Sequence, residues 1–179
     1  MKYSTLLFLS AFILIMSSCK PQKQNTNTQP TDVTTTEQSS LSASTSLFTE
    51  EDVNQALAFI NSYVDRCNQN RELNSNMEWV YSSKLTTPSF NATLKAIIDQ
   101  AYKDDPELGL EADPIFDAQD YPEAGFELDT FDKQKGALVV KGKNWADFRL
   151  ALQLVKVNGA TLVDGCGSIR IPENERTER

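Results

Sequence analysis

Apolar residues recur at helical spacing in the part of the chain that follows a long polar stretch. They form one face of a helix and are Val53, Ala56, Leu57, Ile60, Tyr63, Val64 and Cys67. Thr49 is suited to cap the start of this helix, and the acidic residues at 50–52 favour its first turn because a helix N-terminus carries partial positive charge. The pattern predicts a core-facing helix to about Asn68, ended by the polar run 68–76. A second apolar stripe predicts another helix over 89–103.

The apolar period changes in the last third of the chain. Phe148, Leu150, Leu152 and Leu154 alternate with other residues, as in a strand that is buried on one face. The dipeptide Asn158-Gly159 predicts a two-residue type I′ turn. Counting back from this turn gives the expected strand pairs, which are Lys156 with Thr161, Leu154 with Val163 and Leu152 with Gly165.

Two further strands are predicted over 126–131 and 137–141. Helices followed by a meander of strands are typical of an α+β fold. We therefore expect N-terminal helices packed on one face of a curved antiparallel sheet of about four strands.

The first nineteen residues carry the signals of an exported, lipid-anchored protein. A positively charged start and an apolar stretch over 6–16 precede Cys19, and the stretch is too short to span a bilayer as a helix. Residues 15–19 resemble the bacterial lipobox, in which the cysteine becomes the acylated first residue of the mature protein. We expect a signal peptide over 1–18 and attachment to the lipid bilayer through acylated Cys19. The alternative is an ordinary secretory signal that is cleaved nearby.

These N-terminal signals indicate a protein of the bacterial cell envelope, and we expect it at the outer membrane. Residues 20–47 are rich in Thr, Ser, Gln, Asn and Pro and offer too little apolar surface to offset the entropy of ordering. We expect 19–47 to be a flexible tether with an average reach of roughly 30 Å. A single domain over 48–172 and a polar tail over 173–179 follow.

Composition excludes several classes of function. The 179 residues include 17 Lys and Arg against 25 Asp and Glu, which gives a net charge of −8. We expect no nucleic-acid partner, because a phosphate backbone requires clustered cations. The chain has no histidine, which removes the usual general base and the commonest zinc ligand. We predict no cofactor, no metal site and no enzymatic activity.

The candidate binding residues lie in an acidic segment, 104–125, where regular periodicity fails. We select Asp113, Asp117, Gln119 and Asp120 because loops present binding groups on a rigid scaffold. The spacing of the acids matches no EF-hand loop. The alternative is structural: Asp113 caps a turn, while Gln119 and Asp120 bond loop backbone. We expect the structural role for Asp113 and Asp120.

Two cysteines remain besides Cys19, in a compartment where disulfides form. The predicted hairpin register puts Cys166 on the face of Ala151, away from the leucine row that should meet the first helix. This argues against a disulfide between Cys67 and Cys166, although a bulge at the neighbouring glycines would reverse the placement. We expect two buried thiols and keep the disulfide as the alternative.

Four short motifs resemble those of the YbjP-like envelope lipoproteins, a family of unknown function. They are Trp79…Ser82-Ser83-Lys84-Leu85, Asp105-Pro106-Glu107-Leu108-Gly109-Leu110, Asp113-Pro114-Ile115…Gln119-Asp120 and Val163-Asp164-Gly165…Gly167. The resemblance covers most of 48–172 and implies a curved sheet wrapped by helices, similar to the nuclear-transport-factor-2-like cone. None of the motifs is a catalytic signature.

These observations favour a non-enzymatic lipoprotein whose tethered domain binds another envelope component, which we expect to be a protein. One alternative is a small-molecule-binding or isomerase-like enzyme that uses the interior of the cone. The acid–base groups available to such an enzyme are Tyr63, Tyr81, Tyr102, Tyr121 and Asp164. Tyr63 lies on the apolar stripe, so we expect it in the core. A third hypothesis is an inhibitor or immunity protein that acts against a cell-wall hydrolase.

Overall fold

The structure is a computed structural model, and it describes residues 47–69 and 72–177. Cys19, the expected signal peptide over 1–18 and the expected tether up to residue 46 lie outside the described residues. The elements of the described part are α1 (Glu50–Gln69), α2 (Leu73–Ser82), α3 (Pro88–Asp104), β1 (Phe126–Asp132), β2 (Ala137–Gly142), β3 (Arg149–Val157), β4 (Ala160–Cys166) and the 3₁₀ turn η1 (Glu173–Glu175). None of the helices within these ranges is long and apolar enough to cross a membrane.

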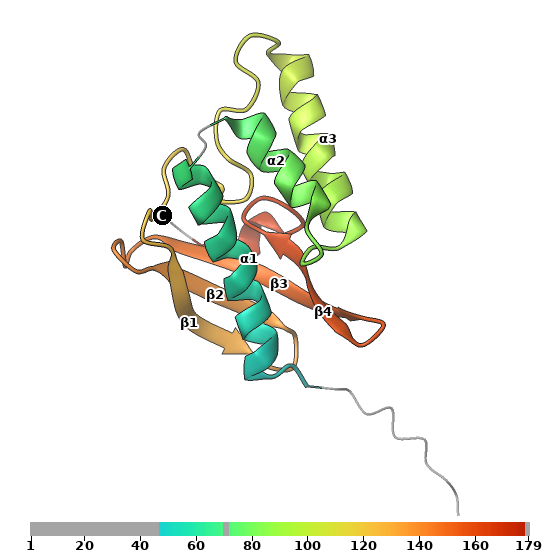
Figure 1. The fold of residues 1–179 in the computed structure, drawn as a ribbon, viewed down its shortest axis with the longest axis vertical. Helices are drawn as coiled ribbons and strands as arrows, with labels where there is room; N and C mark the ends of the chain where they lie inside the picture. Colours follow the sequence, from blue (N-terminus) through green and yellow to red (C-terminus); the bar gives the residue numbers. More distant parts are fainter. Residues whose placement is uncertain (1–46, 70–71, 178–179) are drawn as a thin grey trace, which may run out of the picture. The chain divides into compact units, whose positions relative to one another are not determined.

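The strands form one antiparallel sheet in the order β1-β2-β3-β4, and the helices precede it in the chain. Figure 1 shows α1 across one face of this sheet, where it contacts β1, β3 and β4. α2 packs beside α1, and α3 reaches β4. The predicted α+β class is confirmed, whereas the cone-like curvature stays a prediction.

The core lies between α1 and the inner face of the sheet. Phe59, Ile60 and Tyr63 of α1 are fully buried, as the helical stripe predicts. Leu150 and Leu154 of β3 are buried against them, so the alternating pattern of this strand does mark its core face. Burial of this kind stabilises the fold by about 25 cal/mol for each Å² of apolar surface removed from water.

α1 begins with a capping box that also reaches the sheet. The backbone N–H and the hydroxyl of Thr49 donate to the Asp52 carboxylate at 2.7 and 2.9 Å, and the Asp52 N–H donates to the Thr49 hydroxyl at 3.4 Å. The Thr161 hydroxyl of β4 also donates to Asp52, and the Lys156 ammonium lies 3.2 Å from the same carboxylate. Burial raises the pKa of Asp52, but these hydrogen bonds and the lysine together lower it to about 2.

A side chain of α1 also closes the start of the edge strand β1. The Asn61 amide donates to the Phe126 carbonyl at 3.1 Å, and the Phe126 N–H donates back to the Asn61 oxygen at 2.7 Å. This pair of bonds imitates the ladder of a neighbouring strand. A Cβ atom on Gly125, whose φ is +84°, would lie 2.4 Å from the same Asn61 oxygen. Only glycine therefore fits beside this amide.

The β3–β4 hairpin is confirmed near its turn, but one predicted pair is wrong. Lys156 pairs with Thr161 and Leu154 with Val163, as expected. Leu152, however, pairs with Cys166 instead of Gly165, because β4 contains one extra residue between the partners of Gln153 and Leu154. Such a bulge moves the following side chains to the opposite face of the sheet. Cys166 consequently lies in the core and is fully buried.

α2 was not predicted, and it begins within the polar run 68–76 that was expected to end the first helix. Met77 and Val80 are buried and Leu73 packs against the core, so three apolar residues at helical spacing hold this short helix. Glu72 stands at its N-cap and makes no side-chain capping bond there. The usual start signal is therefore missing from the sequence, whereas α3 has it: the Thr87 hydroxyl accepts the Phe90 N–H at 3.0 Å.

Candidate functional site

The acidic segment contains carboxylates of two kinds, and Asp113 belongs to the enclosed kind. One of its oxygens accepts the N–H groups of Ile115 and Phe116 at 2.8 and 3.4 Å. The other oxygen accepts the Tyr63 hydroxyl at 2.6 Å. Asp113 and Ala118 also exchange two backbone hydrogen bonds. Asp113 thus caps a turn and ties that turn to α1, as the structural interpretation expects.

Burial dominates the electrostatics around this turn. It raises the pKa of Asp113 in spite of the three hydrogen bonds that lower it. Burial and the nearby Asp113 carboxylate raise the pKa of Tyr63 far above its ordinary value. Burial raises the pKa of the Cys67 thiol to about 12. Tyr63 and Cys67 therefore stay protonated at neutral pH, which does not suit a nucleophile or a general base.

The two cysteines are free and buried, so no disulfide joins them. The Cys166 thiol donates to the Ile115 carbonyl at 3.4 Å, and the Cys67 sulfur accepts the Asn76 amide at 3.5 Å. The bulge places Cys166 on the core face, opposite to the face that the uninterrupted register predicts. Both thiols pack as small apolar groups.

Asp164, the carboxylate offered by the isomerase hypothesis, is held by structural partners. Arg170 donates from Nε and Nη2 at 3.1 and 2.9 Å to one oxygen, and Thr87 donates at 2.5 Å to the other. Asp164 thereby connects β4 to the cap of α3. Tyr63 belongs to the separate Asp113 cluster. Tyr121 stacks on Phe116 with ring centroids 4.6 Å apart, and Tyr81 and Tyr102 are exposed.

The exposed carboxylates of interest line a cleft of about 350 Å³, where the segment after Ala118 meets the β2–β3 loop. Its lining consists of Ala118, Gln119, Asp120, Trp145, Asp147 and Phe148, and we call it the Trp145 cleft. The Trp145 side chain is 46% exposed, although large aromatic residues are usually covered. Phe148 is buried beneath it, and the two rings meet edge to face at 5.1 Å.

Backbone hydrogen bonds fix the loop that carries Trp145. The Gly142 N–H donates to the Phe148 carbonyl at 3.0 Å and closes the loop at its base. Within the loop, the Trp145 N–H donates to the Gly142 carbonyl at 3.4 Å, and the Phe148 N–H donates to the Trp145 carbonyl at 3.0 Å. A Cβ atom on Gly142 would lie 2.5 Å from Pro122 and 2.7 Å from the Trp145 carbonyl. The indole is therefore presented by a tightly folded turn.

The polar side chains of the Trp145 cleft have no hydrogen-bonding partners within the described part of the chain. Gln119, Asp120 and Asp147 are exposed, and their side chains form no hydrogen bond or ion pair with residues 47–69 and 72–177. The expectation that Gln119 and Asp120 bond loop backbone is therefore wrong. Carboxylates in this state are available to a ligand without first breaking an internal bond.

Two of the four residues selected from the sequence thus meet in one cleft. Gln119 and Asp120 lie there, whereas Asp113 and Asp117 line a different pocket beside the end of α3. The sequence analysis missed Trp145 and Asp147. The available signal was a tryptophan within a polar loop, Lys143-Asn144-Trp145-Ala146-Asp147, between two strands.

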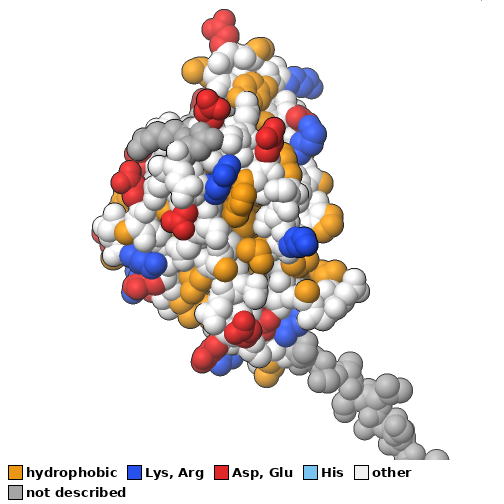
Figure 2. Space-filling view, in the orientation of Figure 1, with side chains coloured by type: hydrophobic (Ala, Val, Ile, Leu, Met, Phe, Trp, Pro, Cys, Tyr) orange, Lys and Arg blue, Asp and Glu red, His pale blue; other side chains and the backbone are white. Residues whose placement is uncertain are grey.

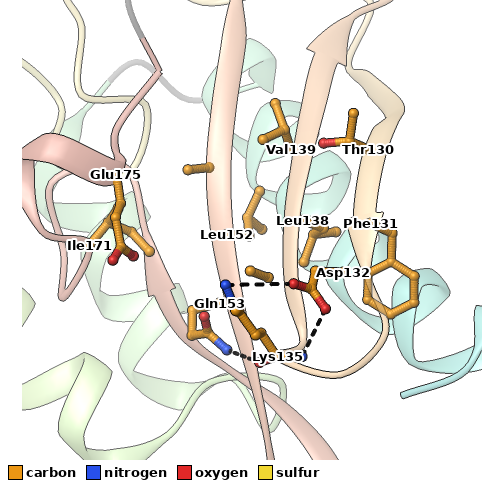
Figure 3. Close-up of a pocket in the computed structure, with 12 residues that line it drawn as sticks. Thr130, Phe131, Asp132, Lys135, Leu138, Val139, Leu152, Gln153, Ile171 and Glu175 are labelled. Carbon is orange, nitrogen blue, oxygen red and sulfur yellow. Dashed lines mark hydrogen bonds and ion pairs between the residues drawn. The ribbon is translucent and has the colours of Figure 1, made fainter. Parts of the chain in front are cut away.

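A larger groove of about 590 Å³ lies on the outer face of the sheet (Figure 3). Thr130, Val139 and Ala151 form one row across three strands and line this groove with small side chains. Three of its polar residues already have partners within the chain. The Lys135 ammonium pairs with Asp132 at 3.8 Å, and the Lys135 carbonyl accepts the Gln153 amide at 2.7 Å. This groove offers less unused chemistry than the Trp145 cleft.

In the described ranges, no three Cys, Asp or Glu side chains are grouped to hold a metal ion. Lys and Arg side chains are scattered among acidic ones on the face drawn in Figure 2. Comparison with protein-family models, curated proteins and solved structures found no match. The resemblance to envelope lipoproteins therefore stays a prediction.

Proposed function

We propose that this protein is a membrane-anchored lipoprotein of the bacterial cell envelope whose domain binds another envelope protein through the Trp145 cleft. The observation that carries the proposal is the exposed indole of Trp145 beside two carboxylates, Asp120 and Asp147, that have no partner in the described residues. The lipobox at Cys19 supplies the anchor. The binding role is not enzymatic.

The energetics of protein association support this use of the cleft. Tryptophan is enriched among the few residues that dominate binding energy, and such residues fill well-packed pockets. Backbone hydrogen bonds fix the main chain around Trp145 before any partner binds, so binding does not have to order this loop. Phe148 beneath the indole adds an apolar base.

The isomerase-like alternative draws less support from the geometry. It requires an accessible acid–base pair, but Tyr63 is fully buried and Asp164 is occupied by Thr87 and Arg170. The inhibitor hypothesis differs from our proposal only in the identity of the partner, and the experiment below distinguishes them by naming that partner.

Site-specific photocrosslinking in cells tests the binding role. A photoreactive amino acid replaces Gln119 in the full-length lipoprotein, and a matched version carries it at Leu108, which is 74% exposed and outside the cleft. We expect a discrete crosslinked protein from position 119 only, and its loss when Trp145→Ala is added. Equal crosslinking from both positions, or none from position 119, overturns the proposal.

Fractionation of a Cys19→Ala variant tests the anchor. Removing the acylated cysteine leaves no covalent lipid, so we expect the variant in the soluble fraction or as an uncleaved precursor. A processed variant that still sediments with membranes contradicts the lipobox.

A further inference from the structure

The Trp145 cleft combines an aromatic face with negative charge on both contributing loops. Asp120 belongs to the segment after Ala118, and Asp147 lies two residues beyond Trp145 on the β2–β3 loop. The lining contains no basic side chain. We infer that the cleft receives an arginine side chain of the partner protein, and this inference rests on the function proposed above.

The chemistry of a guanidinium group fits both parts of this site. The group is planar and stacks on an indole face, where the ring quadrupole attracts the cation. Its outward N–H groups donate to carboxylates in a charge-assisted geometry. Trp145 supplies the face, and Asp120 and Asp147 supply the acceptors. Gln119 adds an amide oxygen at the rim.

The charges around the cleft favour a cation over a neutral or anionic ligand. Lys143 is the nearest basic residue along the loop, but it does not line the cleft. Lys141 is engaged by Glu127 at 3.5 Å, and Arg149 by Asp129 at 3.1 Å. With a net charge of −8 for the whole chain, the potential attracts basic partners over a Debye length of about 8 Å at physiological salt.

Two other carboxylates singled out from the sequence, Asp113 and Asp164, already have partners within the chain. Asp113 accepts hydrogen bonds from Tyr63 and two backbone N–H groups, and Asp164 accepts them from Arg170 and Thr87. The Arg170–Asp164 pair shows within this chain the contact that we infer for the cleft, with a guanidinium at 2.9 Å from a carboxylate oxygen. Asp120 and Asp147 have no such partner among the described residues.

Peptide binding to the full-length lipoprotein in detergent tests the inference. The probes are a tri-arginine peptide and a tri-citrulline peptide, which has nearly the same shape without the charge. We expect the arginine peptide to bind at least tenfold more tightly, with a change in the fluorescence of exposed Trp145. The change should disappear in Trp145→Phe, because the other tryptophan, Trp79, packs against the core.

Charge variants locate the contact. The double variant Asp120→Asn, Asp147→Asn should bind the arginine peptide at least tenfold more weakly than the wild type. The control Glu107→Gln, which removes an exposed charge outside the cleft, should change the affinity for this peptide less than twofold. Equal affinity for the two peptides, equal weakening by the control, or preferential binding of a neutral oligosaccharide to Trp145 overturns the inference. A crosslink from Gln119 together with such a result would leave the binding function standing and reject only the arginine.

Discussion

Asp113 and Asp120 stand seven residues apart in the same acidic segment, yet the fold uses them in opposite ways. The carboxylate of Asp113 is enclosed and accepts three hydrogen bonds, one of them from the buried Tyr63. The carboxylate of Asp120 is exposed at the rim of the Trp145 cleft and accepts none from the described residues. The first holds the loop in position, and the second is presented by it.

The difference shows how one loop combines stability with recognition. The turn from Asp113 to Ala118 is closed by backbone bonds and attached to the core. Gln119 and Asp120 follow this turn directly, and their side chains form no hydrogen bond with the described residues. Exposed binding groups on a loop keep a defined position when a neighbouring part of that loop is fixed to the core, and here the Asp113–Ala118 turn directly precedes them.

Removing the enclosed carboxylate should have the largest effect. Asp113→Ala leaves the Tyr63 hydroxyl buried without its acceptor and removes the cap of two N–H groups, so we expect a loss of about 2–4 kcal/mol in the free energy of unfolding. Urea denaturation at pH 7 measures this loss. A value below about 0.5 kcal/mol would mean that the turn needs no anchor.

The capping carboxylate of α1 extends the comparison to acid stability. The folded pKa of Asp52 is lowered from 3.8 to about 2, so its stabilising effect is complete above about pH 5 and is lost progressively as the pH falls through about 2. We expect this loss to be about 2 kcal/mol in the wild type and absent in Asp52→Asn. Urea midpoints at several pH values measure it, with Glu51→Gln as the exposed neighbouring control. Parallel curves for wild type and Asp52→Asn would contradict the assignment.

Tyr63→Phe isolates the bond between α1 and the turn. The substitution removes one hydroxyl from a fully buried ring and leaves the ring packing intact, so we expect a cost of about 1–2 kcal/mol. Tyr102→Phe, at an exposed ring, is the matched control and should be neutral. Thermal melting distinguishes the two. If Tyr63→Phe and the wild type melted at the same temperature, the hydrogen bonds from backbone N–H groups would be sufficient to hold Asp113.

The smallest effect belongs to the exposed carboxylates. Asp120→Ala and Asp147→Ala remove no internal bond of the described residues, so each should change the free energy of unfolding by less than about 0.5 kcal/mol. The crosslink from Gln119 should weaken in both variants. Destabilisation comparable to that of Asp113→Ala would make Asp120 part of the scaffold.

The sequence predicts those parts of the molecule that local periodicity and turn chemistry determine. α1, α3 and the Asn158-Gly159 hairpin follow from apolar spacing, a capping threonine and a two-residue turn. α2 was not predicted, because its few apolar residues stabilise the helix only through tertiary packing. The bulge could be named only as an alternative, because the glycines near Cys166 permit an extra residue but the strand pattern does not show that one enters. That single residue determines the face on which Cys166 lies.

Only part of the candidate site could be predicted from the sequence, because the rest depends on contacts between distant segments. Gln119 and Asp120 could be selected because their segment lacks regular periodicity and is rich in acids. Trp145 comes from a loop about 25 positions away, and its exposure depends on how two loops meet after folding. Sequence patterns describe which residues share an element, and they do not describe which loops share a surface.

The amide of Asn61 that closes the start of β1 has a consequence for how this chain can evolve. Because the Asn61 oxygen occupies the space where a side chain at position 125 would begin, the two positions cannot vary independently. A homologue that replaces Gly125 by a larger residue must shorten or remove the side chain at 61, and must then satisfy the Phe126 backbone by other means. Positions 61 and 125 should therefore change together or remain fixed as a pair.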